Sequence, residues 1–230
     1  MTYREVTIGD DPQVYELPYK VVYTAILGSL YDDLKEPSVP SHGWKFVCFT
    51  DQPLQSNVWE IRQVPVTDNP QRQARELKIT AFKEWQYSIW LDASFQINMD
   101  LNKLWDNYFT PPFTAPRHPL RHCVYHEIDS FIANGRGDVN QLLAQKAAYK
   151  AAGIPNHGNN IITSGLLMRE NTLGCIELCE EWLKELQTYS VRDQVAFGRV
   201  SIGKEFCTFN WDYSTSKELK YNKHNHLIGK

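Results

Sequence analysis

Short apolar runs that alternate with amphipathic segments constrain the fold of this chain more than any other feature. Five runs rich in β-branched and aromatic residues predict strands, and three segments with apolar residues at helical spacing predict helices. Strands that alternate with helices indicate an α/β fold, with a mostly parallel central sheet flanked by helices. The expected strands are residues 20–27, 45–50, 58–64, 87–97 and 161–168, and the expected helices are residues 71–86, 141–152 and 172–187.

The length of 230 residues suits one domain with an ample core. No repeat or long linker divides the sequence, so we predict a single domain over residues 1–230, with its core at about 18–210 and a C-terminal tail at 211–230. The stretch Thr110–Pro119 contains four prolines and is predicted to be a loop. Asn171 is the expected N-cap of the helix that follows it.

The composition argues against several classes of protein. A net charge of −3 and an isoelectric point near 6.2 lack the basic excess of proteins that hold nucleic acid by its phosphates. A nucleic-acid acceptor is therefore disfavoured, although a local basic groove is compatible with this charge. The N-terminus has no leader pattern, and no run approaches the roughly 18 apolar residues of a membrane span. The five cysteines form no CxxC pair, which favours free thiols, and we expect a cytoplasmic protein.

A lysine breaks the apolar pattern of the expected helix at 71–86. Lys78 falls beside the apolar stripe, and Arg75 and Arg72 precede it on the two turns before. Three cations on neighbouring turns could hold a diphosphate. The alternative, in which the Lys78 side chain runs along the apolar face to solvent, stays open at this point.

An aspartate interrupts the expected strand at 87–97. Asp92 ends the apolar run Ser88–Leu91, where an ionised carboxylate is costly without a partner. The small residues Ala93 and Ser94 follow it and leave space for a metal ion or a diphosphate. A strand-end aspartate that caps the next turn is the plainer alternative.

A second aspartate stands near the start of a further expected helix. With Ser190 as N-cap, Asp193 three residues later completes a capping box, which explains the acidic residue without any function. The capping box does not explain why Arg192 and Gln194 flank the aspartate. The pattern alone nevertheless favours the capping role.

Three histidines, His118, His122 and His126, are spaced by four residues, as zinc ligands on one helix can be. Residues 121–125 are expected to be extended, however, and Pro119 interrupts any helix. A zinc site here is therefore disfavoured.

Together these residues resemble a known family. The chain is similar to the glycosyltransferase-like family of plant mucilage-related and bacterial proteins, which is assigned a GT-A-like fold. The similarity follows the family's order from about residue 20 to residue 200 and rests on the ordered combination of stretches, not on one motif. These stretches are Tyr23–Gly28 with Tyr31 and Asp32, Phe46–Asp51, Ala74, Arg75 and Lys78, Tyr87–Asp92, Arg117 and His118, Cys123–Tyr125 with Glu127, Leu167–Glu170, and Ser190–Gln194.

The resemblance implies a nucleotide-sugar site built on the first strands. It places Thr24, Ala25 and Tyr31 near the base and the ribose, with Asp51 as a candidate for the same pocket. Further residues that we expect at the donor are Ser94, Arg117, His118, Arg192 and Gln194.

The resemblance also implies a charged site for the diphosphate. Arg75 and Lys78 match the family's basic helix positions, and Asp92 stands where GT-A enzymes carry the acidic motif that binds the metal ion. This chain reads Asp-Ala-Ser in place of Asp-x-Asp, and a single carboxylate is a weaker site for Mg²⁺ or Mn²⁺. His224 or His226 could add a late ligand, or the two cations could replace the charge of the metal. A divalent metal is the cofactor that we expect.

The implied function is transfer of a sugar from a nucleotide-sugar, with a UDP-sugar as first choice, to an acceptor hydroxyl. Asp193 is the first candidate and Glu127 the second for a carboxylate that acts as base or stabiliser. The expected acceptor is a surface polysaccharide precursor or, less favoured, a modified DNA base such as bacteriophage enzymes decorate. Two alternatives stay open: a sugar nucleotidyltransferase, whose basic loop is missing from Gly28–Asp33, and a non-catalytic binding module.

Overall fold

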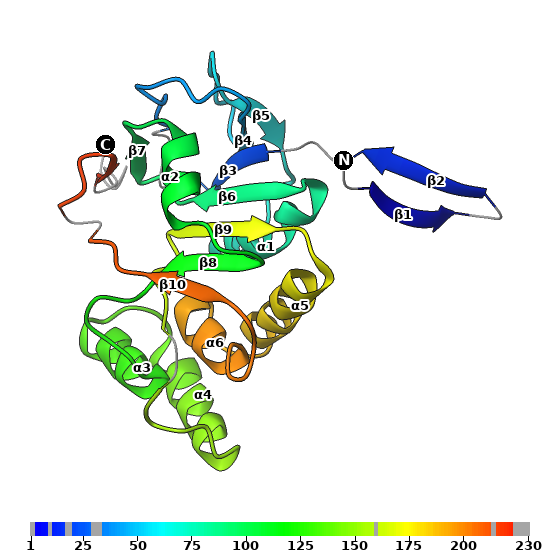
Figure 1. Cartoon of the computed structure of the whole chain (residues 1–230). Helices are drawn as coiled ribbons and strands as arrows, with labels where there is room; N and C mark the ends of the chain where they lie inside the picture. The colour runs from blue at the N-terminus through cyan, green and yellow to red at the C-terminus, as the bar shows by residue number, and fades with distance from the viewer. Residues whose placement is uncertain are drawn as a thin grey trace.

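The computed structural model describes residues 3–8, 11–16, 20–28, 34–158, 161–212 and 215–222 (Figure 1). The strands are β1 (Tyr3–Ile8), β2 (Asp11–Glu16), β3 (Lys20–Ile26), β4 (Lys45–Thr50), β5 (Glu60–Gln63), β6 (Tyr87–Leu91), β7 (Phe95–Ile97), β8 (Phe113–Pro116), β9 (Leu166–Glu170), β10 (Cys207–Phe209) and β11 (Leu219–Tyr221). The helices are α1 (Pro70–Thr80), α2 (Leu101–Tyr108), α3 (Val124–Ala133), α4 (Val139–Ala151), α5 (Leu173–Thr188) and α6 (Asp193–Val200), with a 3₁₀ turn at Ala81–Glu84.

A seven-stranded sheet in the order β10-β8-β9-β6-β3-β4-β5 forms the centre of the molecule (Figure 1). β9 runs antiparallel to both of its neighbours, β6 and β8, whereas the other neighbouring pairs are parallel. The sheet is therefore mostly parallel. Since helices pack on both of its faces, the predicted α/β class is confirmed.

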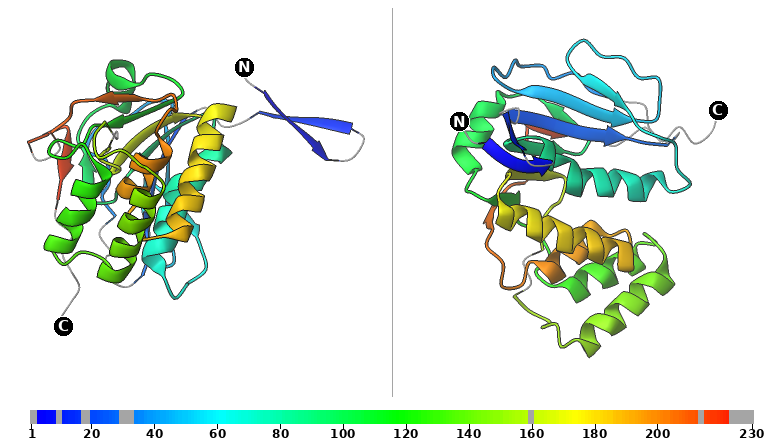
Figure 2. Two further views of the ribbon diagram at one scale, coloured as in Figure 1. Left: turned by 90° about the horizontal axis from the view of Figure 1, so that it is seen from below. Right: turned by 90° about the vertical axis from the view of Figure 1, so that its right-hand side faces the viewer.

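Two apolar layers hold the helices on this sheet. One face packs against α1, α5 and α6 through buried aromatic residues that include Phe82, Trp182 and Phe197. The other face packs against α2 and the small β7–β11 ladder, with Leu101 and Leu219 in the contact. The helices α3 and α4 lie beyond α6, on its side away from the sheet (Figures 1 and 2).

The order of the elements brings one edge of the sheet and one helix end together. β3, β4 and β6 are parallel, so their carboxyl ends lie at the same edge. Helix α1 begins close to this edge, where the Oδ1 atom of Asn69 accepts the N–H of Arg72 at 2.9 Å and Pro70 fills the first helical position. This edge is where a ligand site is expected in such a sheet.

The proline-rich stretch Thr110–Pro119 is not the loop that its composition predicts, because it contains β8. Phe113 and Thr114 pair with β9, and Thr114 also pairs with β10. Two of the four prolines lie before the strand, one is its last residue and one follows it, where a missing N–H does least harm to the ladder. Beyond Pro116, the N–H of Arg117 donates to the carbonyl oxygen of Phe209 at 2.9 Å and continues the pairing.

Several expected boundaries shift because tertiary contacts override the local pattern. The strand expected at 161–168 begins only at Leu166, since Ser164 and Gly165 form a turn. The α-helix expected at 71–86 ends at Thr80 and continues as the 3₁₀ turn. The strand expected at 87–97 divides into β6 and β7 on either side of Asp92.

Two expectations about helix starts are wrong. The N-cap of α5 is Thr172, whose hydroxyl accepts the N–H of Cys175, whereas the Asn171 amide donates to the carbonyl of Lys83 at 2.8 Å. The stretch expected to be extended at 121–125 enters α3 at Val124, because this turn buries Val124 among the apolar residues shared with α4 and α6. Within the described residues, no helix is both long and apolar enough to cross a membrane.

Candidate functional site

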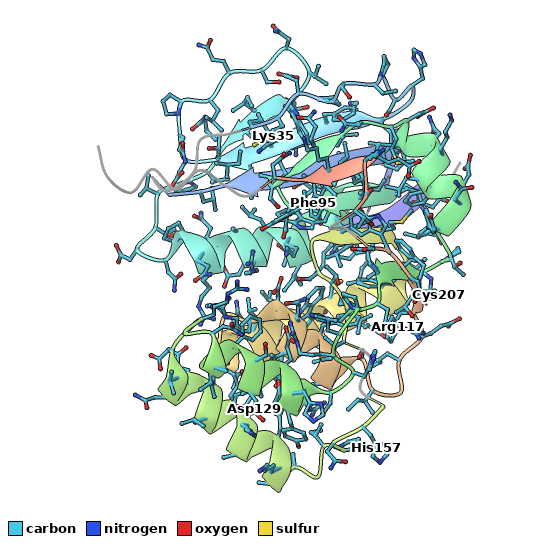
Figure 3. The ribbon with its side chains drawn as sticks, turned by 90° about the vertical axis from the view of Figure 1, so that its left-hand side faces the viewer. Lys35, Phe95, Arg117, Asp129, His157 and Cys207 are labelled. Atoms are coloured by element: carbon cyan, nitrogen blue, oxygen red, sulfur yellow. The ribbon has the colours of Figure 1, made fainter. Side chains whose placement is uncertain are left out.

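A pocket of about 860 Å³ opens at the edge where β3, β4 and β6 end. Its walls come from the exits of these strands, from the segment before α1, from the first turns of α1 and from β11. The lining residues are Ala25–Gly28, Asp51, Gln52, Val66, Thr67, Pro70, Gln71, Ala74, Arg75, Trp90, Asp92–Ser94 and Tyr221. Figure 3 views the molecule from this side and labels Phe95, which follows the Asp92–Ser94 wall.

The turn after β3 is fixed by the carboxylate that directly follows β4. Both carboxylate oxygens of Asp51 accept the N–H of Gly28 at 3.0 Å, and the Gln52 amide donates to the carbonyl oxygen of Gly28. Gly28 has a φ of +75°, and a Cβ there would lie 3.0 Å from Pro70, so only glycine suits this turn. Asp51 therefore shapes the pocket through the backbone.

Of the four residues predicted near the base and the ribose, two line the pocket. Ala25 and Asp51 line the pocket. Thr24 is buried and does not line the pocket, and its hydroxyl oxygen has no hydrogen-bond partner among the described residues. Tyr31 lies outside the described residues.

Lys78 joins two aspartates below the pocket. Its side chain is fully buried, and its Nζ atom lies 3.0 Å from Asp92 Oδ1 and 2.8 Å from Asp193 Oδ2. A third acceptor is the carbonyl oxygen of Ser164 at 3.0 Å, and the ammonium also lies over the Trp90 ring. Held by three oxygen atoms, Lys78 organises both carboxylates and does not itself line the pocket.

Asp92 lies in the pocket wall, with its side chain 33% exposed. Its Oδ1 atom forms the ion pair with Lys78 and accepts the indole N–H of Trp90 at 2.7 Å. Its Oδ2 atom accepts no hydrogen bond from any described residue, and it lies 3.3 Å from where a Cβ on Gly165 would be. One carboxylate oxygen is thus held by the protein, and the other is available to a ligand.

Asp193 is the buried partner of the pair. Its Oδ2 atom accepts from Lys78 and from the Ser164 hydroxyl at 2.9 Å, and Arg75 Nε lies 3.4 Å away. Burial alone would raise the pKa of Asp193, but the charges of Lys78 and Arg75 and the hydrogen bonds hold it well below its usual range. Asp193 is therefore ionised.

The capping box predicted for Asp193 does not form. The N-cap of α6 is Arg192, which makes Asp193 the first residue of the helix, and its Oδ1 atom accepts only the N–H of Gln194. The Ser190 hydroxyl instead donates to Gln145 at 2.6 Å. The acidic residue is explained by its ion pair with Lys78 and not by helix capping.

The three cations of α1 have different positions. Arg75 lines the pocket and contacts Asp193. Arg72 donates to the carbonyl oxygens of Leu186 and Tyr189, at the end of α5, and so ties two helices together. Of the three, only Arg75 faces the pocket.

Glu127 and His118 belong to a separate buried cluster with Arg121. Glu127 on α3 is 1% exposed and forms an ion pair with Arg121, while burial, opposed by that arginine, raises its pKa. Nδ1 of His118 accepts the N–H groups of Leu120 and Arg121 at 3.1 and 3.0 Å. Burial, together with the charges of Arg121 and His122, lowers the pKa of His118 to about 4. Neither Glu127 nor His118 lines the pocket.

The remaining donor candidates lie away from the pocket wall, with one exception. Ser94 lines the pocket. Gln194 donates to the carbonyl of Ile162 at 3.0 Å, and Arg192 lies over the ring of Phe131. Arg117 donates to Thr208 at the β8–β10 side of the sheet (Figure 3).

The described residues offer few ligands for a metal. Among them, no three His, Cys, Asp or Glu side chains gather into a group that could hold an ion. The predicted ligands His224 and His226 lie outside the described part of the chain. Asp92 Oδ2 is the carboxylate oxygen that the pocket presents, and Mg²⁺ is often held by one or two carboxylates together with substrate phosphates.

Some site residues were missed by reasoning from sequence. Ser164 and Gly165 sit in a turn inside a stretch expected to be a strand, so no pattern marked them. Trp90 was treated as part of an apolar strand, although its N–H orients Asp92. Tyr221 lies in the predicted tail, yet β11 pairs with β7 and carries it to the pocket.

Comparison with protein-family models identifies the family of this chain. The model of the TOD1/MUCI70 glycosyltransferase-like domain matches residues 57–210, which is more than half of the chain. The chain belongs to this family. The resemblance stated from the sequence is therefore confirmed, as is the α/β class with a mostly parallel central sheet.

The comparisons with curated proteins and with solved structures give no match and a distant similarity, respectively. No curated protein matches the chain. Among solved structures, the apo structure of the WbbM bifunctional glycosyltransferase is similar, with 13% identity and a TM-score of 0.49. The match covers 86% of this chain and 39% of that chain, so this chain spans less than half of that protein's length.

Proposed function

We propose that this chain is a nucleotide-sugar-dependent glycosyltransferase that binds its donor in the pocket beside α1. The observation that carries the proposal is the joint presence of Arg75 and Asp92 in the wall of a cavity of about 860 Å³. Small-molecule sites commonly have volumes of roughly 300–1,000 Å³. A guanidinium and a carboxylate that converge there suit a diphosphate and its counter-ion.

The donor would lie along the strand exits. The nucleoside would occupy the part lined by Ala25 and Asp51, and the diphosphate would lie against Arg75. We take UDP-sugars as the first donor class. In the reaction, the acceptor oxygen bonds to the anomeric carbon, the bond from that carbon to the diphosphate breaks with its electron pair, and the proton of the acceptor hydroxyl passes to the departing diphosphate or to solvent. Arg75 would stabilise the charge that develops on the leaving diphosphate.

Asp92 Oδ2, together with diphosphate oxygens, would hold a divalent cation, either Mn²⁺ or Mg²⁺. When bound, the cation would neutralise charge on the leaving group. His224 or His226 remains a proposed additional ligand. Lys78 contributes indirectly, because it fixes the orientation of Asp92 from below.

Asp193 remains the first candidate for the catalytic carboxylate and Glu127 the second. A general base works best with a pKa near the operating pH, and the pKa of Asp193 is held far below that range. We therefore propose that Asp193 acts through its charge, by holding Lys78 and Arg75. The proposed acceptor is a hydroxyl of a surface polysaccharide precursor, with a modified DNA base as the less favoured alternative.

The experiment is a thermal-stability panel of the full chain with nucleotides and nucleotide-sugars, each with Mn²⁺, Mg²⁺ or chelator. A ligand at 100 times its Kd stabilises the folded state by about 2.7 kcal/mol. We expect UDP and UDP-sugars to raise Tm, with a larger rise when metal is present. The Asp92→Asn variant should keep the metal-free rise and lose the increment due to metal.

Absence of any shift across the nucleotide panel would contradict the proposal. A shift with nucleotide but no release of UDP from any UDP-sugar, with or without acceptor sugars, would instead support a non-catalytic binding module. If chelator does not change the rise in Tm caused by nucleotide, Arg75 and not a metal ion neutralises the diphosphate charge.

A further inference from the structure

Arg192 is a cation that forms no ion pair within 4.0 Å with any described residue. It lies at the start of α6 and is partly buried. Its Nε atom is enclosed and donates to no described residue, whereas its terminal nitrogens also lack a hydrogen-bond partner there but are not enclosed. A donor on a charged group is costly to bury unless a partner satisfies it. The terminal nitrogens are therefore the part of the group that suits a ligand with an acceptor.

The nearby carboxylates are already engaged. Asp193 is held by Lys78, Ser164 and Arg75, and Glu127 is held by Arg121. The pKa of Arg192 is lowered, first by burial and then by the neighbouring charges of Arg75 and Arg136. The carboxylates of Asp193 and Glu127 act in the opposite direction, but their effect is smaller. The surroundings of Arg192 are thus short of negative charge.

The backbone around Arg192 is shaped to admit its guanidinium. The group lies over the Phe131 ring, 4.5 Å from its centroid. Gly137 has a φ of +90°, and a Cβ there would lie 3.0 Å from Arg192 Nε and 3.2 Å from one of its terminal nitrogens. An aromatic ring and a glycine thus fix the plane of the guanidinium, which is the preorganisation that bidentate recognition of an anion requires.

Arg75 connects this region with the pocket. It lines the pocket wall, contacts Asp193, and is the charged neighbour with the largest effect on Arg192. Arg136, on the exposed loop after α3, adds a third guanidinium with no ion pair in the described structure. We use the name anion site for Arg75, Arg136 and Arg192 together; Arg75 is its link with the proposed diphosphate position.

We infer that the acceptor is an anionic sugar, whose carboxylate or phosphate binds the anion site chiefly through Arg192. The inference rests on the proposed function, because the pocket must be the donor site for Arg192 to lie on the acceptor side. A planar guanidinium binds either anion in a bidentate manner. The acceptor would thus be selected by its charge as well as by its hydroxyl.

The experiment measures the Kd of glucuronate, glucose 6-phosphate and glucose for the full chain, by calorimetry or NMR titration, at constant ionic strength and with saturating UDP. With the donor pocket filled, we expect at least one of the two anionic sugars to bind about ten-fold more tightly than glucose. The preferred sugar distinguishes a carboxylate from a phosphate. Arg192→Gln should abolish this preference and leave the Kd of UDP within about two-fold.

Arg199→Gln is the matched control, because Arg199 lies about two turns further along the same helix and does not line the pocket. It should preserve both affinities, and circular dichroism should show that both variants are folded. If UDP prevents anionic sugars from binding, or if Arg192→Gln weakens UDP as much as the sugar, the anion site belongs to the donor and the inference is wrong. If UDP does not bind the wild type at all, the proposed function fails, and the sugar titration still tests Arg192.

Discussion

The buried cation Lys78 pairs with two aspartates whose surroundings differ, one on the strand side and one on the helical side. On the strand side, Asp92 lies in the pocket wall, 33% exposed, with one oxygen uncommitted. On the helical side, Asp193 is 8% exposed and accepts from Lys78 and Ser164, with Arg75 nearby. The strand side therefore offers a carboxylate oxygen to a ligand, and the helical side holds the Lys78 side chain in place.

This difference separates stability from activity. A change on the helical side leaves buried charge without compensation and should reduce the free energy of unfolding. A change on the strand side removes a ligand group that is partly solvated and should chiefly reduce turnover. Substitutions at Lys78, Asp193, Asp92 and Gly165 test this division.

Lys78→Met should have the largest effect, because it leaves two carboxylates near each other without their shared cation. Breaking a buried ion pair costs about 3–5 kcal/mol, and turnover should fall to background. Urea unfolding and donor turnover measure the two quantities. Lys83→Met is the control: its ion pair with Glu180 is at the surface and should contribute at most about 1 kcal/mol. Equal free energies of unfolding for the two variants would show that Lys78 does not hold the two carboxylates of the site together.

Asp193→Asn should lower the free energy of unfolding by about 3 kcal/mol at neutral pH. The folded pKa of Asp193 is depressed below its unfolded value of about 3.9. Its contribution is therefore fully present above about pH 4 and is lost as the pH falls through the folded pKa. The difference in stability between wild type and variant should shrink on acidification below about pH 4. A difference that is independent of pH would show that the carboxylate charge is not what stabilises this side.

Asp92→Asn should lower the free energy of unfolding by only about 1 kcal/mol, because an amide oxygen still accepts the N–H of Trp90 and lies next to the Lys78 ammonium. Turnover should nevertheless fall by about 100-fold, since the charged ligand group is lost. Activity on the donor identified by the nucleotide panel, together with urea unfolding, separates the two effects. Near-normal turnover would place the diphosphate site elsewhere.

The strand side was largely predictable from the sequence. Asp92 interrupts an apolar strand, and residues at the carboxyl ends of parallel strands meet at one edge, so its position in a site followed from pattern and topology. The helical spacing also predicted cations on successive turns of α1. It could not predict that Arg72 turns to the carbonyls of Leu186 and Tyr189, more than a hundred residues away along the chain.

The helical side was less predictable because its contacts are not local. Ser164 and Asp193 meet only after the chain has formed β9, α5 and α6, and the capping-box pattern gave a local explanation that the fold does not use. Likewise, the prolines around β8 masked a strand that exists through pairing with β9 and β10. Helix α2 was not predicted.

Gly165→Ala should give the smallest effect and the sharpest test of the strand side. The new Cβ would lie 3.0 Å from the ring of Phe95 and 3.3 Å from Asp92 Oδ2, so both neighbours must shift by a few tenths of an ångström. Overpacking of this kind costs about 1 kcal/mol or slightly more, and the displaced carboxylate should weaken UDP binding in the presence of metal. Gly174→Ala on α5 is the matched control, because its Cβ meets no atom within 4 Å, and alanine in a helix should stabilise it by about 0.5–1 kcal/mol. Opposite signs of the two stability changes, with weaker UDP binding only in Gly165→Ala, would confirm that the space beside Asp92 is kept for the ligand. A Gly165→Ala variant with unchanged stability and UDP affinity would mean that Asp92 is free to move, and that Lys78 and Trp90 do not fix its orientation.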